Sequence, residues 1–217
     1  MGKVSYWRQT GIFDPSQHGN QKVTVVGAGG IGSLLVLGLS KLGIKKIELW
    51  DADVVSPHNL PNQFFKVSDI GRLKVEAIRD LTKEIAENVE IDFRAKMWEG
   101  EELEGIVVSA VDSMEVRKKI FQAIKMNSGV PIFVDGRIGG QVIKVLMIDP
   151  SNIDECDRYE KTLDGKPVEL PCNARAVFDV GFFVGAMLTR AIRIWITTGE
   201  KIFQATMDVR NLNLIKD

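Results

Sequence analysis

The chain has 217 residues, of which 45% are hydrophobic and 26% charged, a composition typical of a globular α/β protein with a full core. Its formal net charge of -1 provides no overall basic field, so we expect no nucleic-acid partner. With only two cysteines and no signal peptide, the sequence argues against a disulfide-stapled secreted fold, and we expect a cytoplasmic protein.

The predicted elements begin after a polar N-terminal arm, residues 1–20. Strands are predicted at 22–26, 46–50, 89–94 and 106–110, and helices at 30–42, 72–88 and 113–127. This alternation is typical of a parallel sheet with right-handed crossovers. We therefore predict an α/β fold: a Rossmann-like, mainly parallel sheet flanked by helices.

The second half of the chain is predicted to extend this sheet with antiparallel strands. Strands at 131–135 and 141–149 flank a glycine-rich turn at 136–140, and a last strand lies near 201–207. Residues 150–172 carry prolines and many charges, which predicts a flexible, crossover-type loop.

The apolar stretch from Val177 to Thr198 predicts a long helix, near 176–197. Because it contains Asp179, Arg190 and Arg193, we expect a buried helix and no membrane span. With no internal repeat, we expect residues 1–217 to form a single domain.

A glycine-rich turn follows the first predicted strand, and Asp51 ends the second strand nineteen residues after Gly32. In such a turn Gly27 permits the tight bend, Gly29 lets phosphate approach the backbone, and Gly32 lets the helix pack on the strand. The helix N-terminus offers unpaired N–H groups to phosphate, and Asp51 is placed to accept hydrogen bonds from ribose hydroxyls. The predicted nucleotide-binding glycines are Gly27, Gly29, Gly30 and Gly32. The alternative is a purely structural turn with a capping aspartate.

The residues after the second strand extend the pattern. They read Asp51-Ala-Asp53-Val-Val-Ser-Pro-His-Asn59-Leu-Pro-Asn62-Gln63 and then Asp69-Ile-Gly-Arg-Leu-Lys74. This pattern resembles that of the ubiquitin-activating-enzyme-like superfamily, which includes the ThiF, MoeB and HesA groups. Further matches are Arg8-Gln9, Ser109-Ala-Val-Asp112-Ser-Met-Glu-Val-Arg117 and Cys172-Asn-Ala-Arg, so the likeness covers nearly the whole chain.

The resemblance implies an ATP- and Mg²⁺-dependent adenylyltransferase. Members of this family attack the α-phosphate of ATP with a carboxylate, usually the C-terminal glycine of a small ubiquitin-like or sulfur-carrier protein. The products are an acyl adenylate and pyrophosphate, and the adenylate gives the carboxyl group a good leaving group. Because a carboxylate and a triphosphate repel each other, such a site must supply compensating positive charge.

The resemblance also implies roles for individual residues. Lys74 would bridge phosphate oxygens and Asp112 would bind Mg²⁺. Arg8 would reach the phosphates in a partner subunit, which implies a homodimer. The residues expected to bind nucleotide beside the glycine turn are Asp51, Asp53, Asn59, Gln63 and Lys74.

Each of these side chains also has a structural interpretation. Lys74 could be an exposed lysine at a helix start, and Asp112 could cap the helix at 113–127. Arg117 could pair with Asp112 or lie in solvent, and Arg8 could simply belong to the polar arm.

Cys172 is the candidate nucleophile, with Arg175 and the following helix N-terminus able to lower its pKa; the alternative is an inert thiol. Cys156 lies among acidic residues, which disfavours its thiolate.

The sequence departs from the family pattern at two features. Asn62 stands where relatives have a phosphate-binding arginine, and Arg72 or Arg137 could replace that charge. The chain also lacks the C-x-x-C pairs that bind structural zinc in many relatives, so we predict no zinc.

Two other functions stay open at this point. Asn62 would fit a degenerate relative that binds nucleotide or a partner without turnover. The glycine turn alone would fit an NAD(P)-dependent Rossmann oxidoreductase, although hydride transfer needs none of Asn59, Gln63, Lys74 or Asp112.

Overall fold

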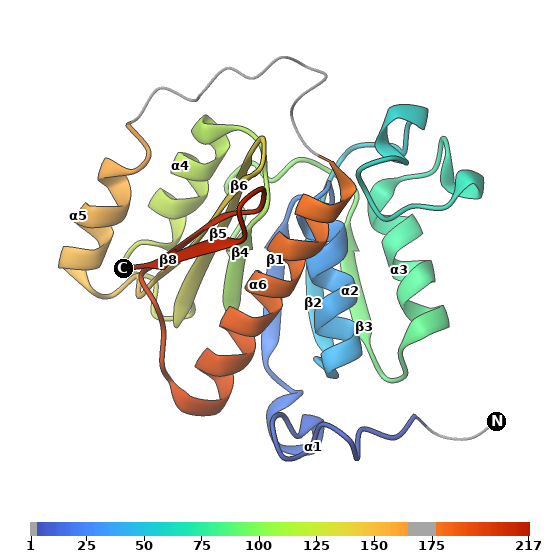
Figure 1. Cartoon of the computed structure of the whole chain (residues 1–217), viewed down its shortest axis with the longest axis horizontal. Helices are drawn as coiled ribbons and strands as arrows, with labels where there is room; N and C mark the ends of the chain where they lie inside the picture. The colour runs from blue at the N-terminus through green and yellow to red at the C-terminus, as the bar shows by residue number, and fades with distance from the viewer. Residues whose placement is uncertain (1–3, 165–176) are drawn as a thin grey trace.

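The computed structural model describes residues 4–164 and 177–217 and contains one eight-stranded sheet, ordered β3-β2-β1-β4-β5-β6-β7-β8 (Figure 1). Its strands are β1 (Lys22–Val26), β2 (Lys46–Trp50), β3 (Glu90–Arg94), β4 (Ile106–Ser109), β5 (Ile132–Gly139), β6 (Val142–Ile148), β7 (Gln204–Asp208) and β8 (Asn213–Lys216). Strands β3, β2, β1, β4 and β5 pair in parallel, and β5 to β8 pair in antiparallel. The predicted mainly parallel sheet with an antiparallel extension is confirmed.

Helices cover both faces of the sheet. They are α1 (Pro15–His18), α2 (Gly32–Leu42), α3 (Lys74–Ile85), α4 (Met114–Ile124), α5 (Ile153–Lys161) and α6 (Phe178–Thr198), with short 3-10 helices η1 (Pro57–Asn59) and η2 (Val67–Asp69). Helices α2, α3 and α6 pack on one face, and α4 and α5 on the other. In β4, Ile106 and Val108 face the first layer and Val107 the second, the alternation expected of a strand buried on both sides.

The prediction of a loop over residues 150–172 is wrong for its first part, because α5 lies there. Asn152 caps this helix by accepting a hydrogen bond from the Glu155 N–H at 3.1 Å. Cys156 and Tyr159, three residues apart, are both fully buried against the sheet. These two buried side chains and the cap are enough to form a helix here, and the many charged side chains of the segment lie on its exposed side. Residues 165–172 lie outside the described part of the chain.

Three other boundaries differ from prediction. Strand β5 continues through the expected turn to Gly139, and the hairpin turns at Gly140 and Gln141, with Gly140 at φ 62°. The C-terminal strand is a hairpin of β7 and β8. The N-terminal arm is anchored, since Phe13 is buried and Asp14 caps α1.

Helix α6 packs closely on α2. A Cβ atom added at Gly181 or Gly185 would lie 2.8 or 3.0 Å from Leu34. By length and composition α6 could cross a membrane, with a mean hydropathy of 1.4 over its apolar window, but one such helix is weak evidence because core helices pass the same test. Its inner face, which includes Val184 and Leu188, is fully buried in the core.

Candidate nucleotide site

The glycine turn joins the C-terminal end of β1 to α2 and packs against the chain after β4. Gly27 has φ +104° and its N–H donates to the Trp50 carbonyl at 2.8 Å. A Cβ at Gly27 would lie 2.6 Å from the Ala110 carbonyl oxygen, and one at Gly32 would overlap the Gly27 carbonyl oxygen. At Gly29, by contrast, nothing lies within 4 Å. Two glycines are therefore required by the chain's own backbone, and Gly29 leaves room for a ligand.

Asp51 connects the end of β2 to this turn. Its carboxylate accepts hydrogen bonds from the backbone N–H of Ala28 at 2.7 Å and of Asp53 at 2.8 Å. Burial raises the pKa of Asp51, and these two hydrogen bonds oppose the rise. Since an ionised carboxylate has about four acceptor positions, Asp51 can brace the turn and still accept from ribose hydroxyls.

Lys74 is buried, so the interpretation as an exposed lysine is wrong. Its ammonium lies 2.8 Å from the Asp53 carboxylate, and the two side chains are 8% and 65% exposed. The Lys74 N–H also donates to the Asp53 carbonyl at 2.9 Å, and Val54 forms a β-bridge with Leu73. These contacts bring the two family-like segments, 51–63 and 69–74, to one place beside the sheet.

The end of the first segment carries polar residues close to the turn. The Asn59 side chain is buried and accepts a hydrogen bond from the Ser56 N–H at 2.9 Å, so its oxygen has a structural role. The side-chain oxygens of Asn62 and Gln63 are buried with no hydrogen-bond partner among the described residues. The backbone of Asn62 also lies near Gly30: a Cβ added at Gly30 would be 3.2 Å from the main-chain carbonyl oxygen of Asn62. Unpartnered buried oxygens here fit a site that a polar ligand completes.

Asp112 follows β4 and is exposed beside the turn. It does not cap α4, because Ser113 does so by accepting from the Val116 N–H at 3.3 Å. Over residues 4–164 and 177–217, no group of three His, Cys, Asp or Glu side chains could hold a metal alone. A single exposed carboxylate fits Mg²⁺, which proteins commonly hold with one or two carboxylates, water and substrate phosphates.

Arg117 follows neither of its predicted arrangements. It is 3% exposed, and its guanidinium donates to the buried Asp135 carboxylate and to the Val111 carbonyl. Burial lowers the pKa of Arg117 to about 10. Spacing favoured a partner five residues away, whereas the sheet register sets Ser109 beside Asp135. An aspartate within the apolar run of β5 was the signal for this pair.

Arg72 and Arg137, which could supply the positive charge that Asn62 lacks, already have acidic partners. Arg72 pairs with Asp69 at 2.9 Å and with Asp80 at 2.5 Å. Arg137 pairs with Asp135 at 2.6 Å and donates to Thr162. Both guanidiniums are thus already engaged by carboxylates.

Arg8 lies far from the glycine turn of its own chain. The neighbouring Gln9 side chain donates to the Leu42 carbonyl at 2.8 Å, at the C-terminal end of α2. The turn is at the other end of this 11-residue helix, a separation of about 16 Å at 1.5 Å per residue. Figure 1 shows the arm at the opposite end of the sheet from the start of α2. Arg8 is not brought together with the other site residues within one chain.

The two cysteines differ in what can be said of them. Cys172 lies outside the described residues. Cys156 is fully buried, and burial raises the pKa of its thiol. Nearby carboxylates add to this rise, in the direction that the acidic surroundings predicted.

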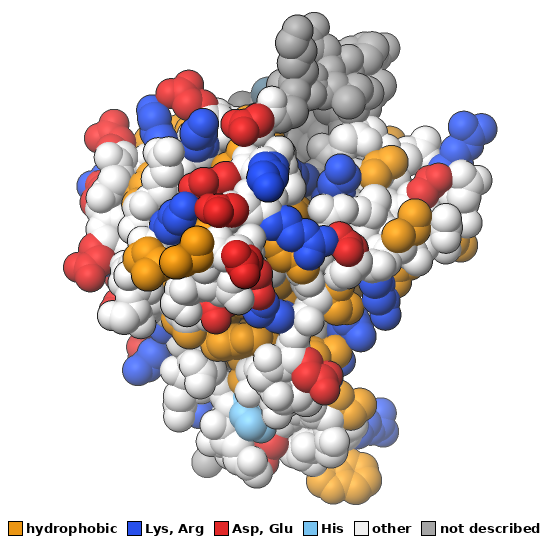
Figure 2. Space-filling model, turned by 90° about the vertical axis from the view of Figure 1, so that its left-hand side faces the viewer, with side chains coloured by type: hydrophobic (Ala, Val, Ile, Leu, Met, Phe, Trp, Pro, Cys, Tyr) orange, Lys and Arg blue, Asp and Glu red, His pale blue; other side chains and the backbone are white. Residues whose placement is uncertain are grey.

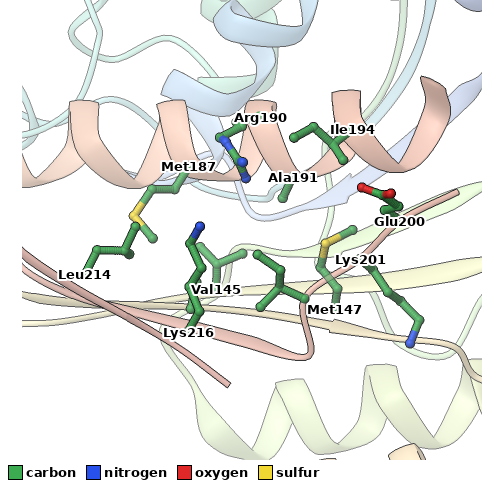
Figure 3. Close-up of a pocket in the computed structure, with 12 residues that line it drawn as sticks. Val145, Met147, Met187, Arg190, Ala191, Ile194, Glu200, Lys201, Leu214 and Lys216 are labelled. Atoms are coloured by element: carbon green, nitrogen blue, oxygen red, sulfur yellow. The ribbon is translucent and has the colours of Figure 1, made fainter. Parts of the chain in front are cut away.

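A groove of about 370 Å³ lies away from the turn, between the C-terminal half of α6 and strands β6 to β8. Figure 3 shows Arg190 and Lys216 pointing into it beside Met187 and Leu214. None of its lining residues belongs to the glycine turn, so it is separate from the candidate nucleotide site. On the face that carries α5, Figure 2 shows basic and acidic side chains interspersed, without the single-sign field typical of a nucleic-acid surface.

The chain is similar in sequence to known proteins. The tRNA threonylcarbamoyladenosine dehydratase 2 of Saccharomyces cerevisiae is 33% identical over 123 residues, covering 52% of this chain and 27% of that protein. The ubiquitin-like modifier-activating enzyme 5 of Dictyostelium discoideum is 26% identical over 217 residues, covering 83% of this chain and 54% of that protein. The chain thus spans about half, or less, of the length of these curated relatives.

The fold also matches solved structures. A crystal structure of Escherichia coli MccB with ATP has a TM-score of 0.72 at 16% identity, covering 93% of this chain and 65% of that chain. A sequence model described as the ThiF family matches residues 8–215. The chain belongs to the ThiF family.

Proposed function

We propose that the chain is an ATP-dependent adenylyltransferase that activates a carboxylate. The observation that carries this proposal is the meeting of Lys74 and Asp53 at 2.8 Å beside a turn that Asp51 braces. A buried lysine at a glycine turn suits a triphosphate, and hydride transfer to NAD(P) has no need of it. Membership of the ThiF family supports the same reading.

The residues suggest a division of work. Asp51 binds the ribose hydroxyls, Gly29 leaves room for phosphate, and Lys74 offsets negative charge as the two anions approach. Asp112 would hold Mg²⁺, which neutralises phosphate charge when bound. The carboxylate oxygen forms a bond to the α-phosphorus as the bond to pyrophosphate breaks, giving an acyl adenylate. No proton needs to move, so the chain's task is positioning and charge compensation.

The proposed substrate is the C-terminal glycine of a small ubiquitin-like or sulfur-carrier protein. The Dictyostelium relative is named a ubiquitin-like modifier-activating enzyme, which supports this class. A second candidate is a relative that binds nucleotide or a partner without turnover. It is favoured by Asn62, since Arg72 and Arg137 are both engaged by carboxylates.

Ligand-dependent melting tests the nucleotide. ATP with Mg²⁺ at 100 times its dissociation constant would add about 2.7 kcal/mol, or a rise in Tm of about 5–10 °C for a chain of this size. NAD at the same concentration should give no rise. A rise with NAD alone would contradict the proposal.

Exchange of labelled pyrophosphate into ATP separates turnover from binding alone. We expect exchange only when a carrier protein ending in glycine is present. A melting shift without exchange, across carriers encoded near this gene, would favour the second candidate.

We also propose that the chain acts as a homodimer, with Arg8 reaching the site of the partner subunit. Support comes from the N-terminal arm, where Trp7 is 80% exposed and Ile12 is 65% exposed. Large apolar side chains exposed to this extent are typical of a surface that packs against another protein. Sedimentation equilibrium should give about twice the chain mass of 24.1 kDa. A constant monomer mass at micromolar concentrations would refute this assembly.

A further inference from the structure

A fully buried carboxylate lies beside the candidate site, on the strand next to β4. Asp135, on β5, has no exposed surface and receives three side-chain donors: the guanidiniums of Arg117 and Arg137 and the hydroxyl of Tyr159. Its two oxygens serve different parts of the fold. Oδ1 accepts from Arg117, while Oδ2 accepts from Arg137 at 2.6 Å and from Tyr159 at 2.9 Å.

Through Arg117, the Oδ1 atom of Asp135 is linked to the residue that precedes the candidate metal ligand, Asp112. The guanidinium of Arg117 spans from Asp135 to the Val111 carbonyl, the peptide that immediately precedes Asp112. The same stretch touches the glycine turn, since a Cβ at Gly27 would lie 3.2 Å from the Val111 nitrogen. Arg117 therefore fixes the backbone just before Asp112, in the segment that follows β4.

The Oδ2 side reaches the end of α5. Arg137 donates to the Thr162 carbonyl at 3.1 Å and to its hydroxyl at 3.0 Å, and its guanidinium lies 5.5 Å from the centre of the Tyr159 ring. Tyr159 itself packs on Phe121 and Phe133. These contacts involve no residue of the nucleotide site.

Stability alone is a weak reason for this network. A buried ion pair is often no more stabilising than apolar residues of the same volume, because both charges lose their hydration. Here two guanidiniums share one carboxylate, and most of their neighbours in this layer are apolar. The network instead fixes positions, because the planar guanidinium of Arg117 holds its two acceptors, the Asp135 carboxylate and the Val111 carbonyl, relative to each other.

We propose that Asp135 is a positioning residue that, through Arg117, holds Asp112 where it can bind Mg²⁺ with the nucleotide. This inference rests on the proposed function. Arg117 and Arg137 donate to the same carboxylate, but only Arg117 also contacts the backbone of the candidate site. Replacing Arg117 should therefore affect the site, and replacing Arg137 should not.

The test compares Arg117→Lys with Arg137→Lys. Lysine keeps a positive charge beside Asp135 but lacks the fork, so in Arg117→Lys the hold on Val111 is lost. Calorimetry with α,β-methylene-ATP, with and without Mg²⁺, measures the binding that depends on the metal. We expect Arg117→Lys to weaken Mg²⁺-dependent binding by about 10–100-fold, the usual range for groups that orient a metal ligand. Binding without Mg²⁺ should fall far less, and Arg137→Lys should match the wild type in both measurements.

The outcomes are distinguishable. An equal loss in both variants, or in binding with and without Mg²⁺, would reduce the network to a structural role and overturn the inference. If Arg117→Lys does not fold, Asp135→Asn replaces it with the same expected split. A wild-type protein that binds no Mg²⁺-nucleotide would instead refute the proposed function.

Discussion

Gly32→Ala is expected to destabilise the fold strongly. Its Cβ would overlap the Gly27 carbonyl oxygen, and neither backbone segment can move away, because Gly27 also lies against Ala110. Overpacking that forces backbone shifts costs about 3 kcal/mol or more at such a site. Urea unfolding of Gly32→Ala, followed by circular dichroism, should show a lower midpoint or no folded baseline.

Gly29→Ala is the matched control for this prediction. Nothing lies within 4 Å of a Cβ at Gly29, so the free energy of unfolding should stay the same or rise slightly. Nucleotide affinity should nevertheless fall, because the methyl group occupies the space left for phosphate. If Gly29→Ala proved as unstable as Gly32→Ala, the steric distinction between the two glycines would be wrong.

Asp112→Ala is expected to lower pyrophosphate exchange by about 10³-fold, since a bound metal supplies several kcal/mol of charge stabilisation and 1.36 kcal/mol corresponds to a factor of ten. The fold should be unaffected, because Asp112 is exposed and Ser113 caps α4. Initial rates of exchange at saturating ATP measure the loss.

Ser113→Ala separates a local helix effect from the loss of a ligand. Removing the cap should cost about 1 kcal/mol of stability while leaving most of the exchange activity. Exchange that survives in Asp112→Ala would reject the assignment of this carboxylate to the metal.

The parallel half of the fold could be predicted because its signals are local. A β-branched strand, a glycine turn and an apolar helix identify β1 and α2 within twenty-one residues of sequence. The second half depends on longer-range packing. Helix α5 has only a narrow buried stripe at Cys156 and Tyr159, and its charges gave a stronger signal than its cap.

In the candidate site, too, local motifs could be predicted from the sequence, whereas contacts between distant segments could not. Sequence placed Lys74 and Asp53 in one motif, but their contact follows from the path of the chain between them. Arg117 was assigned to the wrong partner because proximity in sequence favoured Asp112, and only the pairing of β4 with β5 brings Asp135 beside it. The pair joins helix α4 to strand β5, so its partner cannot be read from spacing along the chain, although the aspartate in the apolar run of β5 marks one half of it.

The contact between Gly27 and the chain after β4 has a thermodynamic consequence. A ligand that shifts the turn also shifts the backbone that carries Asp112, because no space separates the two segments. The free energies of nucleotide and cation binding are then coupled, and the coupling is reciprocal: whatever factor the cation adds to nucleotide affinity, the nucleotide adds to cation affinity. The close packing of the turn on this segment thereby makes the two ligands cooperative without any large movement of the domain.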